Sequence, residues 1–364
     1  MTRAGFDDVV LLTGFPAFAA RKMCEELLRG PERIFVHALV RKERLDEAKE
    51  VLDTVPLEQR QRVAFIVGDT SAIDFGLARE ELRELTKEVD VIHHLAQVVR
   101  PGTNATTAHA VNVRGAREVT EIAALCAGLK CLVFHSLATV SGDRSGPVLE
   151  AELDEGQGFR SEVEETLAHA ERVLRQKAAK LPIAVVRPTM MCGDTQTGDV
   201  EQFDGPFFLL QLVLGAPPEL PLPLPGRPET PLHLVPIDYV MKAAHAIGRD
   251  PRSPGRTFHI GDPSPHTLRR VLERIAAAGG RRGPHAFLPV NLTKALLRTP
   301  GIDRLARSPR SFLATLATPV TYSLANTTEI LAGTDIRCPS FESYVDGLVD
   351  HVQRSRATVG AASP

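Results

Sequence analysis

The sequence predicts an α/β fold in which a parallel, doubly wound sheet is followed by a smaller C-terminal lobe. Two observations lead to this prediction. Short apolar runs alternate with segments of helical spacing over the first half of the chain, which is typical of a parallel sheet with helices on both faces. The first apolar run also ends at Thr13-Gly14, directly before a helical segment, where such a sheet turns from strand into helix.

The elements of the first half follow from their apolar spacing and from the turns that end them. Strands are expected at residues 9–12, 34–40, 63–67, 89–93, 131–134 and 183–186. Helices are expected at 21–28, 42–52, 111–125 and 162–179, because their apolar residues recur at helical spacing. A strand followed by a helix therefore repeats along this part of the chain.

After Arg187-Pro188 the pattern changes. The stretch 206–236 is rich in proline, so we expect irregular chain that covers a site. Helices at 237–247 and 266–278, a strand at 257–260, and a short extended piece with a final helix between 318 and 352 complete the lobe. We therefore expect a nucleotide-binding type domain over 1–188, a C-terminal lobe over 189–353 with some segments returning to the sheet, and a flexible tail over 354–364.

Composition excludes several classes of protein. The 43 Lys and Arg residues nearly balance the 45 Asp and Glu, which argues against nucleic-acid binding through bulk positive charge. No apolar run is long enough to span a membrane, and no basic leader is evident, so we expect a cytoplasmic protein. Five scattered cysteines without a C-x-x-C pair predict neither a disulfide framework nor a metal site.

Several motifs in a fixed order carry a family resemblance. They are L-L-T-G-F-P at 11–16, V-R at 40–41, G-D at 68–69, H-L-A at 94–96, V-N-V-x-G-A at 111–116, H-S-L-A-T-V-S-G at 135–142, A-E-R at 170–172, V-R-P-T at 186–189, G-D-T-x-T-G at 193–198 and V-P-I-D-Y-V at 235–240. With them the chain resembles the extended short-chain dehydrogenase/reductase family, and within it the thioester reductases and fatty acyl-CoA (male sterility) reductases. The resemblance implies a Rossmann-like fold over about residues 9 to 350.

The resemblance also implies a site for NADP(H). Gly14 would form the phosphate turn, Arg41 would meet a 2′-phosphate, Asp69 would contact the adenine, and Ala96 would line the groove. The full set of implied cofactor residues is Thr13, Gly14, Phe15, Pro16, Ala17, Phe18, Arg41, Gly68, Asp69, Leu95, Ala96 and Pro188. Ala17 places a methyl group where the backbone of relatives approaches the pyrophosphate, so nucleotide binding is left open at this stage.

The catalytic residues that the resemblance implies are replaced. An active member uses a tyrosine as proton donor, a lysine four residues later that lowers its pKa, and a Ser or Thr that orients the substrate oxygen. In the segment matching Y-x-x-[ST]-K-x-x-A-E-R, Val163 and Leu167 occupy the tyrosine and lysine positions, and counting back from Gly142 places Leu137 at the Ser/Thr position. We therefore assign no catalytic residue and no metal ligand.

Other side chains near the expected site offer weaker candidates. These are His135, Ser136, Thr139, Ser141, Asp143, Arg144 and Cys192. Ser136 is expected to make a strand-end hydrogen bond, and Cys192 to be a buried small hydrophobic residue. For a substrate pocket we single out Thr139, Met190 and Phe207, with an apolar acyl-type chain as one occupant and ordinary core or a partner surface as the alternative.

Three functions remain open from the sequence. The first is an SDR-like protein without ordinary Tyr/Lys-dependent reduction, with a ligand-binding, regulatory or non-redox biosynthetic role. The second is an NADPH-dependent reductase of a thioester, aldehyde or ketone with a substituted proton donor. The third is a protein-interaction scaffold. A homodimer through the helices at 111–125 and 162–179 is a further expectation from the resemblance.

Overall fold

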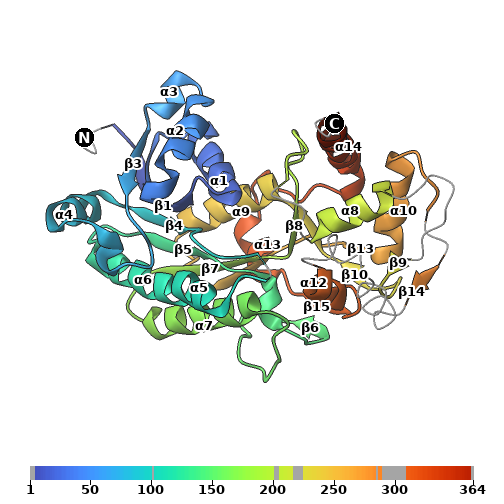
Figure 1. Cartoon of the computed structure of the whole chain (residues 1–364). Helices are drawn as coiled ribbons and strands as arrows, with labels where there is room; N and C mark the ends of the chain where they lie inside the picture. Colours follow the sequence, from blue (N-terminus) through green and yellow to red (C-terminus); the bar gives the residue numbers. More distant parts are fainter. Residues whose placement is uncertain are drawn as a thin grey trace.

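The computed structural model describes residues 5–100, 102–200, 205–215, 224–283, 286–288 and 309–361. Figure 1 shows two parts, a sheet with helices on both faces and a smaller lobe beside it. Within the described residues, no helix combines the length and apolar character needed to span a membrane.

The central sheet has seven parallel strands in the order β12-β7-β5-β4-β1-β2-β3. Their bounds are β1 Asp8–Phe15, β2 Ile34–Val40, β3 Val63–Val67, β4 Val91–His94, β5 Cys131–His135, β7 Ile183–Pro188 and β12 Thr257–Ile260. The chain order reverses between β1 and β4, so the carboxyl ends of these two strands flank the crevice where such sheets hold ligands. The predicted α/β fold is confirmed.

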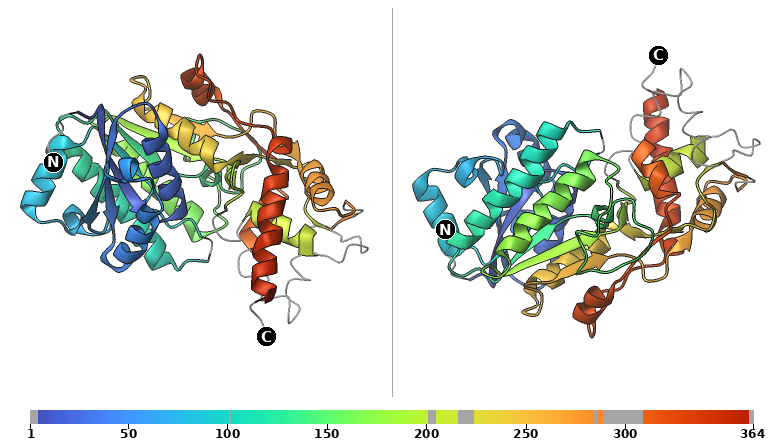
Figure 2. Two further views of the ribbon diagram at one scale, coloured as in Figure 1. Left: turned by 90° about the horizontal axis from the view of Figure 1, so that it is seen from above. Right: turned by 90° about the horizontal axis from the view of Figure 1, so that it is seen from below.

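Helices cover both faces of this sheet. One face packs against α1 Phe18–Arg29, α2 Leu45–Asp53, α9 Ile237–Arg249 and α13 Ala325–Leu331. The other packs against α4 Arg79–Glu88, α6 Gly115–Leu125 and α7 Glu162–Lys177, of which α6 and α7 lie side by side (Figure 2). The alternation along β1 follows from this, since Val10 and Leu12 belong to the first core and Leu11 to the second.

The second lobe has its own apolar core. It is formed by α8 Pro206–Gly215, α10 Leu268–Ala278, α12 Pro309–Thr315 and α14 Val345–Ala361. Four two-stranded pairs lie outside the central sheet: β8 Met190–Cys192 with β11 Leu234–Pro236, β10 Pro231–Leu232 with β13 His266–Thr267, β6 Gly146–Val148 with β15 Val320–Tyr322, and β9 Leu224–Pro225 with β14 Phe287–Leu288. Smaller elements are the α-helices α3 Leu57–Arg60 and α5 Ala105–Ala108, the 3₁₀ turns η1 Lys42–Arg44, η2 Ile73–Gly76, η4 Ala138–Ser141 and η5 Phe341–Ser343, and η3, a π-helical turn at His109–Arg114.

Two parts of this lobe are helical where the sequence predicted irregular chain or a tail. The start of the proline-rich stretch is helix α8, because Pro206 occupies its first position, where the missing N–H costs nothing, and the rest of α8 contains no proline. Residues 354–361, expected as part of a flexible tail, continue helix α14. Helix α14 packs with α8 and α10, as Figure 2 shows from two directions.

Candidate functional site

The turn between β1 and α1 requires glycine. Gly14 has a φ of +92°, in the left-handed region that side chains disfavour. A Cβ at Gly14 would lie 2.8 Å from the carbonyl carbon and oxygen of Leu95 and 2.9 Å from the nitrogen of Ala96. The turn then closes as the Ala17 N–H donates to the Gly14 carbonyl at 2.9 Å, and α1 begins at Phe18. The backbone of β1 and the loop after β4 therefore touch at Gly14.

The buried hydroxyl of Thr13, on β1, is hydrogen-bonded to the end of β4 and to the loop that follows it. Thr13 Oγ1 accepts from the N–H groups of Leu95 and Ala96, each at 3.2 Å, and lies 3.0 Å from Nδ1 of His94. Because both acceptor sites of the oxygen are used, its proton goes to Nδ1, and His94 carries its own proton on Nε2. Burial lowers the pKa of His94 to about 3, which keeps the ring neutral. Thr13 therefore positions the groove without lining it.

A groove with a volume of about 400 Å³ opens at this crevice. Eight of the expected cofactor residues line it: Gly14, Phe15, Ala17, Arg41, Gly68, Asp69, Leu95 and Ala96. Thr13, Pro16 and Pro188 are not among its described lining residues, and Phe18 lines a different pocket. Ten lining residues were missed from the sequence: Leu39, Arg44, Thr70, Ser71, Gln97, Val98, Thr106, Thr107, Ala110 and Val111.

One rim of the groove is charged. The Arg41 side chain is 60% exposed, and its Nε lies 3.7 Å from Asp69 Oδ2. Asp69 Oδ1 accepts from the N–H and the hydroxyl of Ser71 at 2.8 and 2.7 Å. Burial opposes ionisation of Asp69, but the bonds from Ser71 and the charge of Arg41 hold its pKa below the ordinary value. Arg44 adds a second guanidinium, which Glu47 holds at 2.6 Å.

A left-handed turn fixes the Asp69 backbone. Asp74 and Phe75 have φ values of +52° and +56°, which are rare for residues with side chains. The turn buries the Phe75 ring fully and aims the Phe75 carbonyl at the Asp69 N–H, 2.9 Å away. A Cβ at Gly68 would lie 2.6 Å from that same carbonyl oxygen. Glycine is therefore needed before Asp69.

The structure brings together the three positions that the resemblance implies as catalytic in active relatives. Val163 is 3% exposed and Leu167 is fully buried, and both belong to one apolar cluster against which Leu137 packs. The other members are Val98, Val140, Leu153, Phe159 and Ala168. Val98 also lines the groove, so the cluster adjoins it.

Asn112 connects this cluster to the groove. Its Oδ1 accepts from the Val98 N–H at 2.8 Å, and its Nδ2 donates to the Val98 carbonyl and to Thr166 Oγ1, each at 3.0 Å. Thr166 lies on α7 between the Val163 and Leu167 positions. Asn112 and Thr166 are thus hydrogen-bonded beside the apolar cluster, while the three positions themselves carry only hydrocarbon.

Three of the remaining candidate side chains, those of His135, Asp143 and Arg144, are held by structural partners. His135 Nε2 lies 3.2 Å from His93 Nδ1, the Asp143 carboxylate accepts from the Gly158 N–H at 2.9 Å, and Arg144 pairs with Glu152 at 2.8 Å. Burial lowers the pKa of His135 to about 3, and the neighbouring His94 adds to this shift. A neutral, buried imidazole of this kind is a poor base.

Two of the hydroxyl and thiol candidates, Ser141 and Cys192, also have structural partners. The Ser141 hydroxyl lies 3.2 Å from that of Tyr322. The expectation for Ser136 was wrong in detail, because its backbone N–H donates to Val186 while its buried hydroxyl has no hydrogen-bond partner in the described part of the chain. Cys192 donates to the Tyr344 hydroxyl at 3.7 Å, and burial raises the pKa of its thiol to about 12. Such a thiol is a poor nucleophile.

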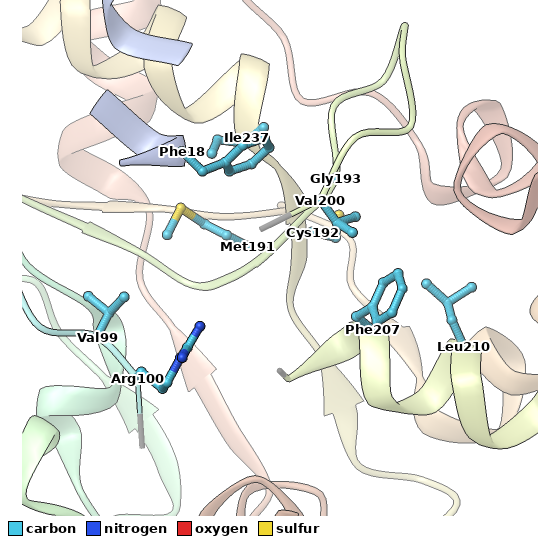
Figure 3. Close-up of a pocket in the computed structure, with 10 residues that line it drawn as sticks. All are labelled: Phe18, Val99, Arg100, Met191, Cys192, Gly193, Val200, Phe207, Leu210 and Ile237. Carbon is cyan, nitrogen blue, oxygen red and sulfur yellow. The ribbon is translucent and has the colours of Figure 1, made fainter. Parts of the chain in front are cut away.

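A second, mainly apolar pocket has a volume of about 170 Å³. Figure 3 shows the side chains that line it. Phe18 and Val99 line it, and their chain neighbours Ala17 and Val98 line the groove. Phe207 was expected here and is present, whereas Met190 and Thr139 are not among the described lining residues. Met191 lines the pocket in place of Met190, which packs into the core of the second lobe.

Comparisons with known proteins place this site in a family. A model of an NAD-binding family, described as male sterility protein, matches residues 12–244. The fatty acyl-CoA reductase wat of Drosophila melanogaster is 25% identical over 285 residues, covering 67% of this chain and 54% of that protein. The chain therefore spans about half the length of that relative.

Solved structures share the fold. The terminal R domain from the myxalamid PKS-NRPS biosynthetic pathway superposes with a TM-score of 0.81 at 23% identity, covering 97% of this chain and 92% of that one. UDP-glucuronic acid 4-epimerase from Bacillus cereus, in complex with NAD, gives 0.66 at 16% identity and covers 95% and 99%. The family model covers more than half of the chain, and the chain therefore belongs to the male sterility protein family.

Proposed function

We propose that this protein binds NADP(H) in the groove and an acyl-type ligand in the second pocket, without Tyr/Lys-dependent reduction. Its role would be ligand binding, regulation or a non-redox step in a biosynthetic pathway. The observation that carries the proposal is the apolar cluster that Leu137, Val163 and Leu167 form with their neighbours. A bound NADPH would supply a hydride, but these three side chains have no proton to give to a substrate oxygen and no charge to stabilise it.

The residues of the groove fit a dinucleotide. Gly14 leaves free the space that a Cβ would fill, so the backbone of the turn is accessible to a pyrophosphate beside the start of α1. Arg41 and Arg44 provide two cations at the far rim, which suits a 2′-phosphate. Ala17 opposes binding through its methyl group in the same groove.

A titration with NADPH, NADP⁺ and NAD⁺ tests the nucleotide part. The chain has no tryptophan, so NADPH fluorescence is read without that background. We expect NADPH and NADP⁺ to bind more tightly than NAD⁺, and Ala17→Gly to tighten NADPH by about tenfold, as relief of one crowded methyl group allows. Absence of binding in both proteins would refute nucleotide binding. Binding only in Ala17→Gly would mean that the methyl group closes the groove, and would rule out the reductase alternative for the natural chain.

The second candidate function is an NADPH-dependent reductase of a thioester, aldehyde or ketone that uses a substituted proton donor. It is favoured by the name of the fly relative, a fatty acyl-CoA reductase. Single-turnover assays with NADPH and an acyl thioester or aldehyde separate the two candidates. Our proposal predicts that bound NADPH is not oxidised, even when the incubation lasts much longer than one turnover of an active reductase. Stoichiometric oxidation with formation of an alcohol or aldehyde would establish the reductase instead.

A further inference from the structure

We infer that the side-chain amide of Gln97 binds the nicotinamide riboside half of the nucleotide, by donating a hydrogen bond from its Nε2 to an oxygen of that half. The inference rests on the proposed binding of NADP(H) in the groove, and it adds a residue that lies outside the motifs of the resemblance. Gln97 belongs to the loop after β4 and lines the groove. Its role follows from an unpaired donor, a fixed backbone and the place of this loop along the sheet.

The amide carries a donor that the fold leaves unpaired. The Gln97 side chain is half-buried, and its Nε2 is buried without a hydrogen-bond partner among the described residues. Nearly all buried donors in native proteins are paired, so such an atom needs an explanation. Among the described side chains that have one, that of Gln97 is the only one that lines the groove. Turning this amide toward a ligand oxygen would break no hydrogen bond of Nε2 and would pair the donor.

The backbone around this amide is held in place. Thr13 Oγ1 accepts from the N–H groups of the two preceding residues, each at 3.2 Å. The Gln97 N–H donates to the Leu95 carbonyl at 2.8 Å. The Asn112 side chain then binds both backbone groups of Val98, at 2.8 and 3.0 Å. The position of Gln97 on the groove wall is therefore preformed, and only its side chain has to turn.

The order of the strands assigns Gln97 to one half of the nucleotide. Strands β2, β1 and β4 are neighbours in this order. Arg41 directly follows β2, Gly14 lies near the end of β1, and Gln97 is the third residue after β4. A dinucleotide with its 2′-phosphate at Arg41 and its pyrophosphate at the Gly14 turn therefore extends toward β4 with its nicotinamide half. That half is the one that meets Gln97.

The side chains beyond Gln97 leave a role for a donor. Val98, the next residue, packs into the apolar cluster that contains Leu137, Val163 and Leu167. The ribose hydroxyls and the carboxamide of the nicotinamide half are polar, and they need hydrogen bonds when they leave water. Hydrocarbon side chains cannot supply these bonds, whereas an amide N–H can donate to a hydroxyl or carbonyl oxygen. Gln97 therefore offers, beside the cluster, what the cluster itself lacks.

Two nucleotides test where Gln97 acts. NADPH carries both halves, whereas adenosine 2′,5′-diphosphate carries the 2′-phosphate and lacks the nicotinamide half. Both are titrated by calorimetry into the natural chain and into Gln97→Met, which keeps the length of the side chain and removes its amide. We expect the variant to bind NADPH about tenfold more weakly and adenosine 2′,5′-diphosphate equally well, because only NADPH loses a hydrogen bond.

Urea unfolding of the nucleotide-free protein provides a second measurement. Gln97→Met replaces a buried, unpaired donor by hydrocarbon, so the midpoint of unfolding should stay the same or rise. An amide that served the fold would give the opposite result, a lower midpoint. Weaker NADPH binding without a loss of stability is therefore the result that identifies a residue directed at the ligand.

Gln61→Met is the matched control. Gln61 is exposed and is not among the described residues that line the groove, so neither measurement should change. The inference is overturned if Gln97→Met binds NADPH as tightly as the natural chain, if it loses affinity for both nucleotides equally, or if its midpoint falls. In these cases binding of both nucleotides by the natural chain leaves the proposed function intact. If the natural chain binds neither nucleotide, nucleotide binding itself is refuted, and the inference falls with it.

Discussion

The guanidinium of Arg187 meets the carboxylate of Glu171 at 2.6 Å in the interior, where both side chains are 1% exposed. Glu171 belongs to the A-E-R segment of α7 and Arg187 to the V-R-P-T segment at the end of β7. Arg187 Nη1 also donates to the Glu152 carbonyl at 2.9 Å. Two motifs that carry the family resemblance therefore serve the fold, because they attach helix α7 to the sheet and to the loop before it.

Glu171→Gln is expected to destabilise the protein by about 3 to 5 kcal/mol, because Arg187 would be left with an uncompensated buried charge. Urea unfolding followed by circular dichroism measures the change. The double variant Glu171→Gln with Arg187→Met removes the orphaned charge and should recover part of the loss. An unchanged midpoint for Glu171→Gln alone would show that water reaches the pair.

Leu167→Lys introduces the lysine that the resemblance implies at this position, and it tests whether the cluster around Val163 and Leu167 is as apolar as its packing indicates. Leu167 is fully buried between Val163 and Ala168, so an ammonium there is expected to cost about 3 kcal/mol or more. Leu167→Met, which keeps volume and polarity, should cost less than about 1.5 kcal/mol. If the lysine variant unfolds at the same urea concentration as the methionine variant, a polar channel reaches this position, and the reductase alternative gains support.

The sequence predicted most of the sheet because strands and apolar runs end together, as at Val67, where β3 ends directly before Gly68-Asp69. The prediction from sequence failed where the residue composition of a segment does not indicate the structure that the segment forms. Helix α4 carries Arg, Glu and Lys on most of its surface and has little apolar spacing, so it was not predicted. Pro206 was read with the prolines that follow it, although it occupies the one helical position that tolerates proline.

Only those residues of the site that belong to the recognised motifs were predicted from the sequence. Phe18 was expected beside Ala17 in the groove, but the first turn of α1 rotates it about 100° away, into the apolar pocket. Thr106 and Thr107 line the groove from α5, and no local pattern indicates that this helix returns to the phosphate turn. Such contacts depend on how helices pack on the sheet, which periodicity does not specify.

Gly14→Ala is expected to weaken NADPH binding by more than tenfold, because the new methyl group must push the Leu95 and Ala96 backbone away from the turn and because alanine disfavours a φ of +92°. Isothermal titration with NADPH measures the loss. Gly128→Ala is a suitable control, since a Cβ at Gly128 meets nothing within 4 Å. Equal affinities in the two variants would place the nucleotide elsewhere.

Arg41→Gln is expected to weaken NADPH by about tenfold and to leave NADH unchanged, because only NADPH carries the 2′-phosphate that a guanidinium would meet. The ratio of the two dissociation constants is the decisive quantity, since a general disturbance of the groove changes both. Arg60→Gln, which removes a surface arginine paired with Asp53, supplies the control. If the ratio is the same in the natural chain and in Arg41→Gln, Arg41 does not contact the 2′-phosphate. Arg44 would then be the arginine to test.

We expect the free energy of unfolding to fall in acid because of three buried histidines, His94, His135 and His259. Burial is the largest cause of their depressed pKa values, each about 3, and the charge of Arg187 further lowers that of His259. Between pH 6.5 and 3 the unfolded chain binds these protons and the folded chain does not, so stability is lost as the pH falls through this window. At about pH 5.5 the loss is about 1.4 kcal/mol for each histidine relative to neutral pH.

The His94→Asn variant isolates one of these contributions, because the asparagine oxygen can take the place of Nδ1 opposite Thr13 but does not titrate. The free energy of unfolding is compared between about pH 7.5 and 5.5 in both proteins, so the absolute stability of the variant cancels. Its pH-dependent loss should be smaller than that of the natural chain by about 1.4 kcal/mol. If both proteins lose the same free energy of unfolding between these pH values, His94 titrates normally. The assignment of a neutral His94 ring that accepts from Thr13 would then be wrong.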